Sequence, residues 1–344
     1  MPTQYDLFFL RALMSLHPGT GRSEFEAIDH KVQRDWRGFP TIHNSSLKGA
    51  LREYLMQDPA LRDLVNYAFG GNHSLDNALI QVLRNLQKRK DLKLDQDTLD
   101  ILESELNGQV KEVFQAGRFS LHDAELLAIP VRSNYRPFFL VTCPQILQDL
   151  REKSRFFLGT DRSSAIRSEI DFLEKEGFLH NTSNWLLYLG SEPTTDSEIY
   201  LERFEIKARL TQVDGQKLPI LKSLFGNHNF IGIVMDQGDQ QGSDAPFNVL
   251  VDDFHLPIVP RNQLEHRISR QVWFEQVLHA ETRFYSFVGY AGGDSSHKFK
   301  VKFDEQIDEK VINIAANLSV GYGRCEFRKL ESVLKTLNAD QNDQ

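Results

Sequence analysis

Apolar and polar positions follow two different periods near the N-terminus. Across residues 9–16 they alternate, which predicts a strand, and the segment 17–21, with one proline and two glycines, predicts a turn after it. Across residues 44–55 the apolar side chains recur at intervals of three and four, which predicts a helix with one apolar face. The residues on that face are Leu47, Ala50, Leu51, Tyr54 and Leu55. A strand, a connection and an amphipathic helix therefore open the chain.

The rest of the chain interleaves strand and helix patterns. Short apolar runs predict strands at 128–131, 138–141, 247–251, 283–290 and 324–327. Helical spacing predicts helices at 146–150, 166–173 and 310–316, with a highly charged helical stretch at 61–111. Residues 337–344 have the composition of a frayed tail. Interleaved elements with long crossovers predict an α+β fold, with helices on one face of a sheet.

Aromatic side chains in the predicted strand 283–290 admit two interpretations. Bases of RNA could stack on them, or they could pack in the core. We favour the core, because alternating aromatic residues are what a buried sheet requires. The residues are Phe284, Tyr285, Phe287 and Tyr290.

Composition narrows the class of protein. The 344 residues suffice for one large core or two modest ones. No apolar run approaches the length of a membrane span, and the N-terminus lacks a secretory signal pattern. Cys143 and Cys325 lie far apart, and the eleven histidines form no HxH or HxxxH pair, so we predict neither a disulfide framework nor a dedicated zinc site. We therefore expect a cytoplasmic protein with no membrane partner.

The segment 27–54 holds the first candidates for chemistry. Asp29 supplies a carboxylate, and the helix that starts near residue 44 supplies open N–H groups and the positive end of its dipole, a site for phosphate. Lys48 and Arg52 share the solvent face of this helix, and Gly49 between them has no Cβ, so a ligand backbone could approach. An ordinary amphipathic helix and a turn aspartate are the alternative interpretation. The predicted capping residues are Asn44, Ser45 or Ser46.

The charge of this segment differs from that of the whole chain. The net charge is −8, whereas an isolated RNA-binding domain is usually basic. Residues 29–53 are locally basic, which is compatible with one groove for RNA on an otherwise acidic protein. The basic residues are Lys31, Arg34, Arg37, Lys48 and Arg52, against Asp29, Asp35 and Glu53.

Several motifs in fixed order resemble a known family. The chain is similar to the RAMP superfamily and, more narrowly, to the target-RNA-cleaving backbone subunits of type III-B CRISPR–Cas (Cmr) effector complexes. The pair Pro-Val-Arg-Ser and Val-Thr-Cys-Pro narrows the resemblance to that subunit. The matching segments are 16–21, 28–29, 33–35, 45–52, 130–133, 141–144, 272–275, 281–285 and the glycine-rich 318–325.

The resemblance implies a more specific fold. It implies one RAMP domain over residues 1–344, with a ferredoxin-like (RRM-type) core and large insertions. The core would comprise about 5–60, 125–150 and 245–330, with a helical insertion at about 61–120. The insertion at about 155–255 would carry a thumb-like β-hairpin, which we place within 177–255.

The resemblance also implies an activity. Such a subunit binds guide RNA beside further copies of itself and other RAMP subunits, and cleaves the complementary target RNA as an antiviral nuclease. Asp29 matches the catalytic position and would hold a divalent cation, Mg²⁺ or Mn²⁺, or accept the 2′-OH proton. One carboxylate can hardly build a two-metal site, so the target's 2′-OH would attack the adjacent phosphate. The RNA-binding positions implied are His17, Arg34, Ser45, Ser46, Lys48, Arg52, Gly321, Gly323 and Arg324.

Two other functions fit parts of the pattern. A non-catalytic scaffold of the same complexes would bind guide RNA but would not need Asp29. A stand-alone endonuclease for guide precursors would favour a histidine-centred site, for which His17 is the candidate proton carrier. The sequence also departs from the family at His30, Lys31, Asp35 and Ile42-His43-Asn44.

Overall fold

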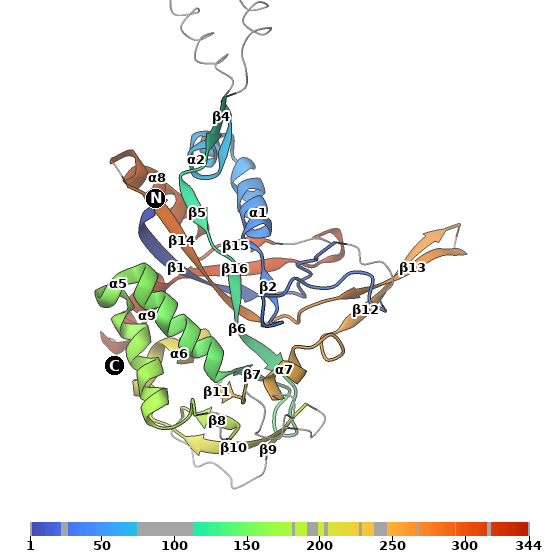
Figure 1. Cartoon of the computed structure of the whole chain (residues 1–344), viewed down its shortest axis with the longest axis vertical. Helices are drawn as coiled ribbons and strands as arrows, with labels where there is room; N and C mark the ends of the chain where they lie inside the picture. Colours follow the sequence, from blue (N-terminus) through green and yellow to red (C-terminus); the bar gives the residue numbers. More distant parts are fainter. Residues whose placement is uncertain are drawn as a thin grey trace, which may run out of the picture.

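A large mixed sheet, with a projecting hairpin at one edge, organises the molecule (Figure 1). The structure, a computed structural model, describes residues 2–21, 27–73, 113–180, 183–190, 199–202, 206–226, 229–236, 246–266, 268–292, 294–314 and 318–342. The sheet has the strand order β15-β16-β1-β14-β6-β7-β11-β8-β10-β9, with β2 beside β6 and β5 beside β14. The α+β class is confirmed.

The elements have the following bounds. The strands of the sheet are β1 (Pro2–Ala12), β2 (Thr41–Ile42), β5 (Phe119–Leu121), β6 (Ala124–Val131), β7 (Phe139–Thr142), β8 (Trp185–Tyr188), β9 (Ile199–Leu201), β10 (Ile206–Gln212), β11 (Phe230–Ile233), β14 (Arg283–Ala291), β15 (Val311–Asn313) and β16 (Arg324–Lys329). There are also two separate two-stranded antiparallel sheets: β3 (Gly70–His73) with β4 (Val113–Ala116), and the hairpin of β12 (Ile258–Glu265) with β13 (Ile268–Gln276). The helices are α1 (Asn44–Met56), α2 (Arg62–Phe69), α5 (Pro144–Lys175), α6 (Pro219–Leu224), α7 (Pro246–Leu250), α8 (Asp294–Ile307) and α9 (Leu330–Asn342).

Four strands form the centre of the sheet. β1 pairs antiparallel with β14 and with β16, and β14 pairs antiparallel with β6. Along the chain these elements come in the order β1, α1, β6, β14, α8, β16, which is the βαββαβ order of a ferredoxin-like sheet. The N-terminal strand therefore lies in the middle of the sheet, with partners from the C-terminal quarter of the chain.

Helices cover both faces of this central sheet. Phe287 and Tyr290 in β14 point to opposite faces, because side chains alternate along a strand. The Phe287 ring packs against Phe157 of α5, and the Tyr290 ring packs against Phe303 of α8. Helices α1 and α2 lie with α8, whereas α6 and α9 lie with α5 (Figure 1). The prediction of helices on one face is wrong, because α5 and α9 supply a second helical layer.

Because helices cover both faces of the sheet, β1 has consecutive apolar residues instead of an apolar–polar alternation. Leu7, Phe8, Phe9 and Leu10 are all buried, on both faces of the strand, as expected for a strand covered on both sides. The strand ends at Ala12, so the alternating pattern that we read over 9–16 covers only its last part. The aromatic residues of β14 are buried as well, which confirms core packing over base stacking.

Several strands and helices differ from the sequence prediction. The strand expected at 247–251 is helix α7, and the helix expected at 310–316 contains strand β15. The tail expected from residue 337 belongs to α9 as far as Asn342. The helices predicted at 146–150 and 166–173 are confirmed: they belong to the two segments of α5, which begins with Pro144 and is interrupted by a kink at Gly159, where φ is +77° and the backbone is not helical. Of the charged stretch 61–111, residues 74–111 lie outside the described ranges.

The insertion after α5 extends the sheet. The described residues of 177–255 include β8, β10 and β11, of which β8 pairs in parallel with β10, and β11 in parallel with β7. The hairpin that projects from the body is β12–β13 (Figure 1). It lies after the 177–255 range in which we placed the thumb-like hairpin. Parts of that range lie outside the described residues, and the location of the thumb stays a prediction. Within the described ranges, no helix combines the length and apolar character needed to cross a membrane.

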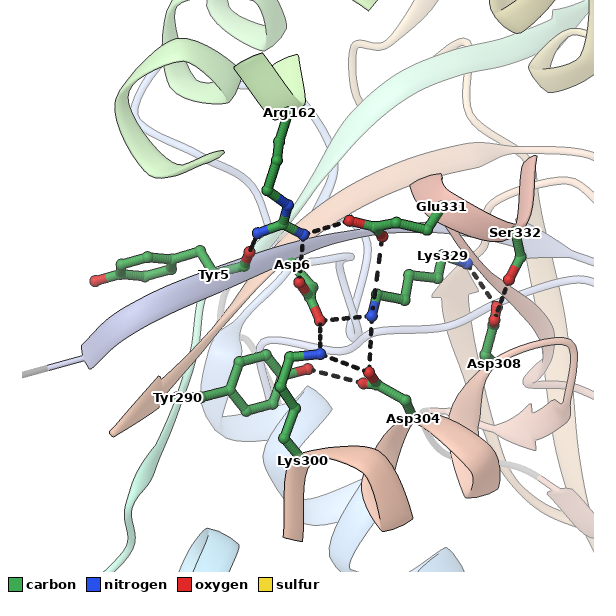
Figure 2. A network of polar contacts seen from close by, with 10 residues as sticks. All are labelled: Tyr5, Asp6, Arg162, Tyr290, Lys300, Asp304, Asp308, Lys329, Glu331 and Ser332. Carbon is green, nitrogen blue, oxygen red and sulfur yellow. Dashed lines mark hydrogen bonds and ion pairs between the residues drawn. The ribbon is translucent and has the colours of Figure 1, made fainter. Parts of the chain in front are cut away.

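A buried ionic network joins the two helical layers at the N-terminal half of β1 (Figure 2). The Asp6 side chain is fully buried and lies 2.6 Å from Arg162 of α5 and 2.7 Å from Lys329, and it also contacts Lys300 of α8. Asp304 of α8 lies 2.7 Å from each lysine. Burial alone would raise the pKa of Asp6, but the two lysines hold it below its ordinary value. The carboxylate therefore stays charged and ties α5 and α8 to β1.

A second buried carboxylate predicts an unusual pH dependence. Glu169 of α5 is 4% exposed and accepts the N–H groups of Ile220 and Leu221 at 2.7 and 2.8 Å. Burial raises its pKa from 4.5 to about 7. A carboxyl whose folded pKa is raised stabilises the fold below the unfolded pKa, and this contribution is lost as pH rises through the folded pKa. Glu169 should therefore lower the free energy of unfolding between about pH 4.5 and 7.

Glu169→Gln should remove this dependence. We expect the free energy of unfolding of the variant to change less between pH 5 and pH 8 than that of wild type, by at most roughly 3 kcal/mol. Urea unfolding midpoints at both pH values measure this change, with Glu176→Gln, at the exposed residue that follows α5, as control. Equal pH slopes for wild type and Glu169→Gln would contradict the argument.

Candidate functional site

Asp29 lies at the base of the projecting hairpin. Its Oδ2 accepts the backbone N–H of Phe274 at 2.8 Å. On either side, the N–H of His30 donates to the Phe274 carbonyl at 3.1 Å, and the N–H of Gln276 donates to the His30 carbonyl at 2.9 Å. The Asp29 loop is thus fixed along the last residues of β13. The other carboxylate oxygen, Oδ1, has no hydrogen-bond partner among the described residues.

Gln276 connects the hairpin to three other segments. Its side chain is fully buried, and its Oε1 accepts the N–H of Val32 at 3.1 Å. Its Nε2 donates to the Asp253 carbonyl at 3.2 Å, and its backbone carbonyl accepts a hydrogen bond from His17. Nothing in the local sequence pattern predicted a role for this glutamine, although it directly follows the motif 272–275. It sets the position of the Asp29 loop against the hairpin.

His17 is a buried contact between the turn and the hairpin. Only 5% of the residue is exposed, and Nδ1 lies 2.6 Å from the Gln276 carbonyl. A carbonyl only accepts, so Nδ1 carries the proton. The other ring nitrogen, Nε2, packs against Gly19, where an added Cβ would lie 2.7 Å away. These contacts give His17 a positioning role, and its predicted contact with RNA stays a prediction.

The start of α1 is held by Gln33. The side-chain Oε1 of Gln33 accepts the N–H of His43 at 2.7 Å, and its Nε2 donates to Ser46 Oγ at 2.9 Å and to the Gly19 carbonyl at 3.0 Å. The N-cap residue is His43, which makes no side-chain cap. The prediction of a cap from Asn44, Ser45 or Ser46 is therefore wrong, because Gln33 and Asp123 take the place of a cap. The Asp123 carboxylate accepts the Asn44 N–H at 2.7 Å.

The two faces of α1 have the predicted character. Leu47, Leu51 and Leu55 are buried, which confirms the apolar face. Lys48 is partly exposed and Arg52 is exposed, and a Cβ added at Gly49 between them would meet no atom within 4 Å. The basic face of α1 is thus open to a ligand.

Charge reversal on this face should weaken RNA binding. If Lys48 and Arg52 contact guide phosphates, Lys48→Glu with Arg52→Glu should reduce affinity for guide RNA, and the slope of log affinity against log salt should fall by about 2. Both residues lie on the polar face, so the fold should remain. Filter binding over a salt series measures the slope. Arg155→Glu with Lys175→Glu, on exposed positions of α5, carries the same charge change as control. An unchanged slope would indicate that Lys48 and Arg52 are ordinary solvated residues that do not contact guide RNA.

Arg34 makes its contacts inside the protein. Its Nη1 donates to the carbonyls of Gly38, at 2.6 Å, and Val251, and its Nη2 lies 3.0 Å from Asp253 Oδ1. Lys31 lies 2.7 Å from the other oxygen of Asp253. These contacts explain a structural role for Arg34, and its predicted contact with RNA stays a prediction.

The glycine-rich loop reaches the same region. Gly321 and Gly323 have φ values of +87° and +90°, which favour glycine. The Gly323 N–H donates to the Ser15 carbonyl at 3.0 Å, and the Tyr322 ring lies under the Arg261 guanidinium at 4.7 Å. The loop therefore sits between the hairpin and the residues that lead to His17. The Arg324 side chain, which opens β16, is exposed.

Glu275 is a second acidic residue of this region. The sequence pattern predicted no role for it. Its carboxylate accepts hydrogen bonds from Trp273 Nε1 at 2.9 Å and from Arg261 Nε at 3.0 Å. Burial would raise its pKa, but these two hydrogen bonds and the charge of Arg261 keep it below the ordinary value. Glu275 is therefore a charged structural partner at the hairpin base rather than a proton acceptor.

The structure thus gathers part of the predicted site. Asp29, His17 and the glycine-rich loop meet at the base of β12–β13, through Gln276 and Arg261. Ser46 joins them through Gln33, and Lys48 and Arg52 follow on the open face of α1. Ser45 is exposed at the start of that helix. Across the described ranges, no group of three or more His, Cys, Asp or Glu residues is placed to hold a metal ion.

Comparison with known proteins gives consistent matches along the whole chain. The Cmr endoribonuclease Cmr4 of Pyrococcus furiosus is 25% identical over 328 residues, which cover 91% of this chain and 92% of that protein. A chain of the type III-B Cmr-beta complex bound to cognate target RNA has the same fold, with a TM-score of 0.68 at 21% identity, covering 96% of this chain and 99% of that chain. Oligomeric Cmr4 from Pyrococcus furiosus gives a TM-score of 0.55 at 19% identity, over 95% and 97% of the two chains.

A family model also matches most of this chain. The model of the RAMP superfamily matches residues 9–326, which include the Asp29 loop, α1, the projecting hairpin and the glycine-rich loop. On this match, the chain belongs to the RAMP superfamily.

Proposed function

We propose that this protein is a backbone subunit of a type III-B RNA-guided effector complex, and that it cleaves the target RNA paired with the guide. The observation that carries the proposal is the position of Asp29, fixed by Phe274 at the base of a projecting hairpin, with the start of α1 held in the same region by Gln33. A relative of nearly the same length is a Cmr endoribonuclease. Guide RNA, target RNA, further copies of the chain and other RAMP subunits would be its partners, in the cytoplasm.

The proposed reaction uses the target RNA's own nucleophile. The 2′-oxygen attacks the adjacent phosphorus, the bond from phosphorus to the 5′-oxygen breaks, and the products carry a 2′,3′-cyclic phosphate and a 5′-hydroxyl. Asp29 Oδ1 accepts the 2′-OH proton, as a general base, and water supplies a proton to the leaving oxygen. Oδ2 remains bonded to the Phe274 N–H, so the carboxylate keeps a fixed direction.

The donor set fits one weakly held divalent cation. Asp29 has one oxygen available beyond its contact with Phe274, and the neighbouring Glu275 is already engaged by Trp273 and Arg261. Mg²⁺ often binds through one carboxylate with waters and substrate phosphates, so in the alternative role Asp29 Oδ1 would hold the ion together with the RNA, and water rather than Asp29 would take the 2′-OH proton. When bound, it would stabilise negative charge on the phosphate.

The remaining residues would hold the site in shape. Gln276, Gln33 and His17 join the Asp29 loop, the helix start and the hairpin through buried hydrogen bonds. Alignment of the attacking and leaving oxygens supplies several kcal/mol in comparable reactions, roughly 7–11 at most. Base pairing with the guide would select the target sequence, and the protein would contact the RNA backbone.

Replacing the scissile ribose with 2′-deoxyribose tests the nucleophile. In the assembled complex we expect cleavage at that position to stop, with target affinity unchanged because base pairing is kept. Denaturing gels follow cleavage, and end-group analysis of the all-ribose products should give the 2′,3′-cyclic phosphate.

Other outcomes would redirect the proposal. Cleavage of the deoxy-substituted target at the same bond would make water the nucleophile. Binding of an all-ribose target without cleavage, under any divalent cation, would leave the non-catalytic scaffold as the function.

A further inference from the structure

Two aromatic side chains near the Asp29 loop stand almost entirely in solvent. Trp36 is 91% exposed and Phe254 is 83% exposed. A large exposed apolar side chain is common as a single case, but two on neighbouring turns beside a functional site call for a ligand.

Both side chains stand on turns with fixed backbones. Around Trp36, Asp35 Oδ1 accepts the N–H groups of Arg37 and Phe39, both at 2.9 Å. Before Phe254, Asp252 Oδ1 accepts the N–H groups of Phe254 and His255, both at 2.8 Å. The exposure of these rings is therefore built into hydrogen-bonded turns.

Arg34 joins the two turns to each other. One end of its guanidinium donates to the Gly38 carbonyl of the Trp36 turn, and the other lies 3.0 Å from Asp253, next to Phe254. Asp253 also lies 2.7 Å from Lys31, two residues beyond Asp29, and its carbonyl accepts from Gln276 of the hairpin base. The Phe254 turn is thus bound to the segment that carries Asp29.

We propose that Trp36 and Phe254 form an aromatic platform on which unstacked bases of the bound target RNA stack, and that Arg34 fixes the spacing of the two rings. This inference rests on the proposed function. Any base offers a π-face, so stacking on a rigid ring holds a strand without reading its sequence. That suits a subunit in which the guide selects the sequence, and it would orient the ribose and phosphate next to Asp29.

Fluorescence of 2-aminopurine in the target RNA tests the platform separately from cleavage. The complex is assembled with Asp29→Asn in its subunit, so that the target stays whole, and the probe base is placed in turn at each position around the scissile phosphate. At one or more positions we expect quenching by stacking, and a severalfold rise in fluorescence with Phe254→Ala or Trp36→Ala. Phe254→Tyr should retain the quenching.

A matched control uses another exposed phenylalanine. Phe156 of α5 is 81% exposed and stands on neither of the two turns, so Phe156→Ala should leave the fluorescence unchanged. Arg34→Lys keeps the charge but not the two-ended guanidinium, and should raise the fluorescence as the alanine variants do. In complexes that retain Asp29, Phe254→Ala should cleave about tenfold more slowly in a single turnover, with a smaller change in target affinity.

Three results would overturn the platform. The first is fluorescence that does not change at any probe position in either alanine variant. The second is an equal change with Phe156→Ala. The third is loss of assembly by Phe254→Ala or Trp36→Ala without RNA, measured by mass photometry, which would make the patch a contact between protein subunits. If instead Asp29→Asn still cleaves while the platform variants change the fluorescence, the catalytic proposal fails and the platform stands.

Discussion

Asp29→Asn is expected to lower the rate of target cleavage by roughly 10²–10⁴-fold, the range seen on loss of a general base. Assembly and target affinity should stay close to wild type. The amide oxygen of asparagine can still accept the Phe274 N–H, which Asp29 Oδ2 now accepts at 2.8 Å, so the loop keeps its anchor while the charge is lost. Single-turnover cleavage assays and equilibrium binding with the assembled complex measure both quantities.

Asp29→Ala separates chemistry from anchoring. Alanine removes both the charge and the acceptor for the Phe274 N–H. The alanine variant should therefore cleave no faster than the asparagine variant, and the loop beside the hairpin should become more mobile. Hydrogen exchange at residues 28–32 measures the loosening. If the asparagine variant cleaves at the wild-type rate, Asp29 takes no part in the chemical step.

Asp6→Ala should be among the most destabilising single changes in the chain. It leaves Lys300, 7% exposed, and Lys329 without the carboxylate that lies between them (Figure 2). Removing one partner of a buried ionic group costs about 3–5 kcal/mol, because a buried charge loses its compensation. Denaturant unfolding at pH 7 measures the change in the free energy of unfolding, together with the thermal midpoint.

The pH dependence of this effect has the opposite sign to that of Glu169. The folded pKa of Asp6 is lowered below 3.8, so its contribution is fully present above the unfolded pKa and is lost as pH falls through the folded value. The difference in the free energy of unfolding between wild type and Asp6→Ala should therefore become smaller only in strong acid. Arg270→Ala breaks an ion pair whose side chains are more than half exposed, and should cost less than about 1 kcal/mol. Equal losses in the two variants would contradict the role of burial.

The sequence by itself determined the elements whose pattern is local. The apolar face of α1 and the strands β6, β7, β14 and β16 follow from residue spacing over a few turns or a few pleats, which is set by backbone geometry. Such patterns can be read from the sequence because all of the residues that form them lie close together in the chain. Asp29 and the glycine-rich loop were found differently, through the resemblance of motifs in a fixed order to a known family.

Where a pattern depends on distant partners, the sequence prediction failed. The apolar run of β1 reflects burial from both sides, and nothing near β1 in the chain indicates the second helical layer from α5 and α9. The segment 247–251 reads as a strand, yet it forms α7, where Phe247 packs against Phe39 from the opposite end of the chain. Tertiary contacts override local propensity in such cases.

The site shows the same division. The sequence placed Asp29 and Lys48 in one segment, but only the fold brings β13 alongside, so that Phe274 fixes the carboxylate and Gln276 and Glu275 shape the hairpin base. Burial of His17 and the contact of Arg34 with Asp253 were likewise decided by residues more than two hundred positions away. A hydrogen bond needs a partner at about 3 Å, and which residue arrives at that distance is a property of the whole fold.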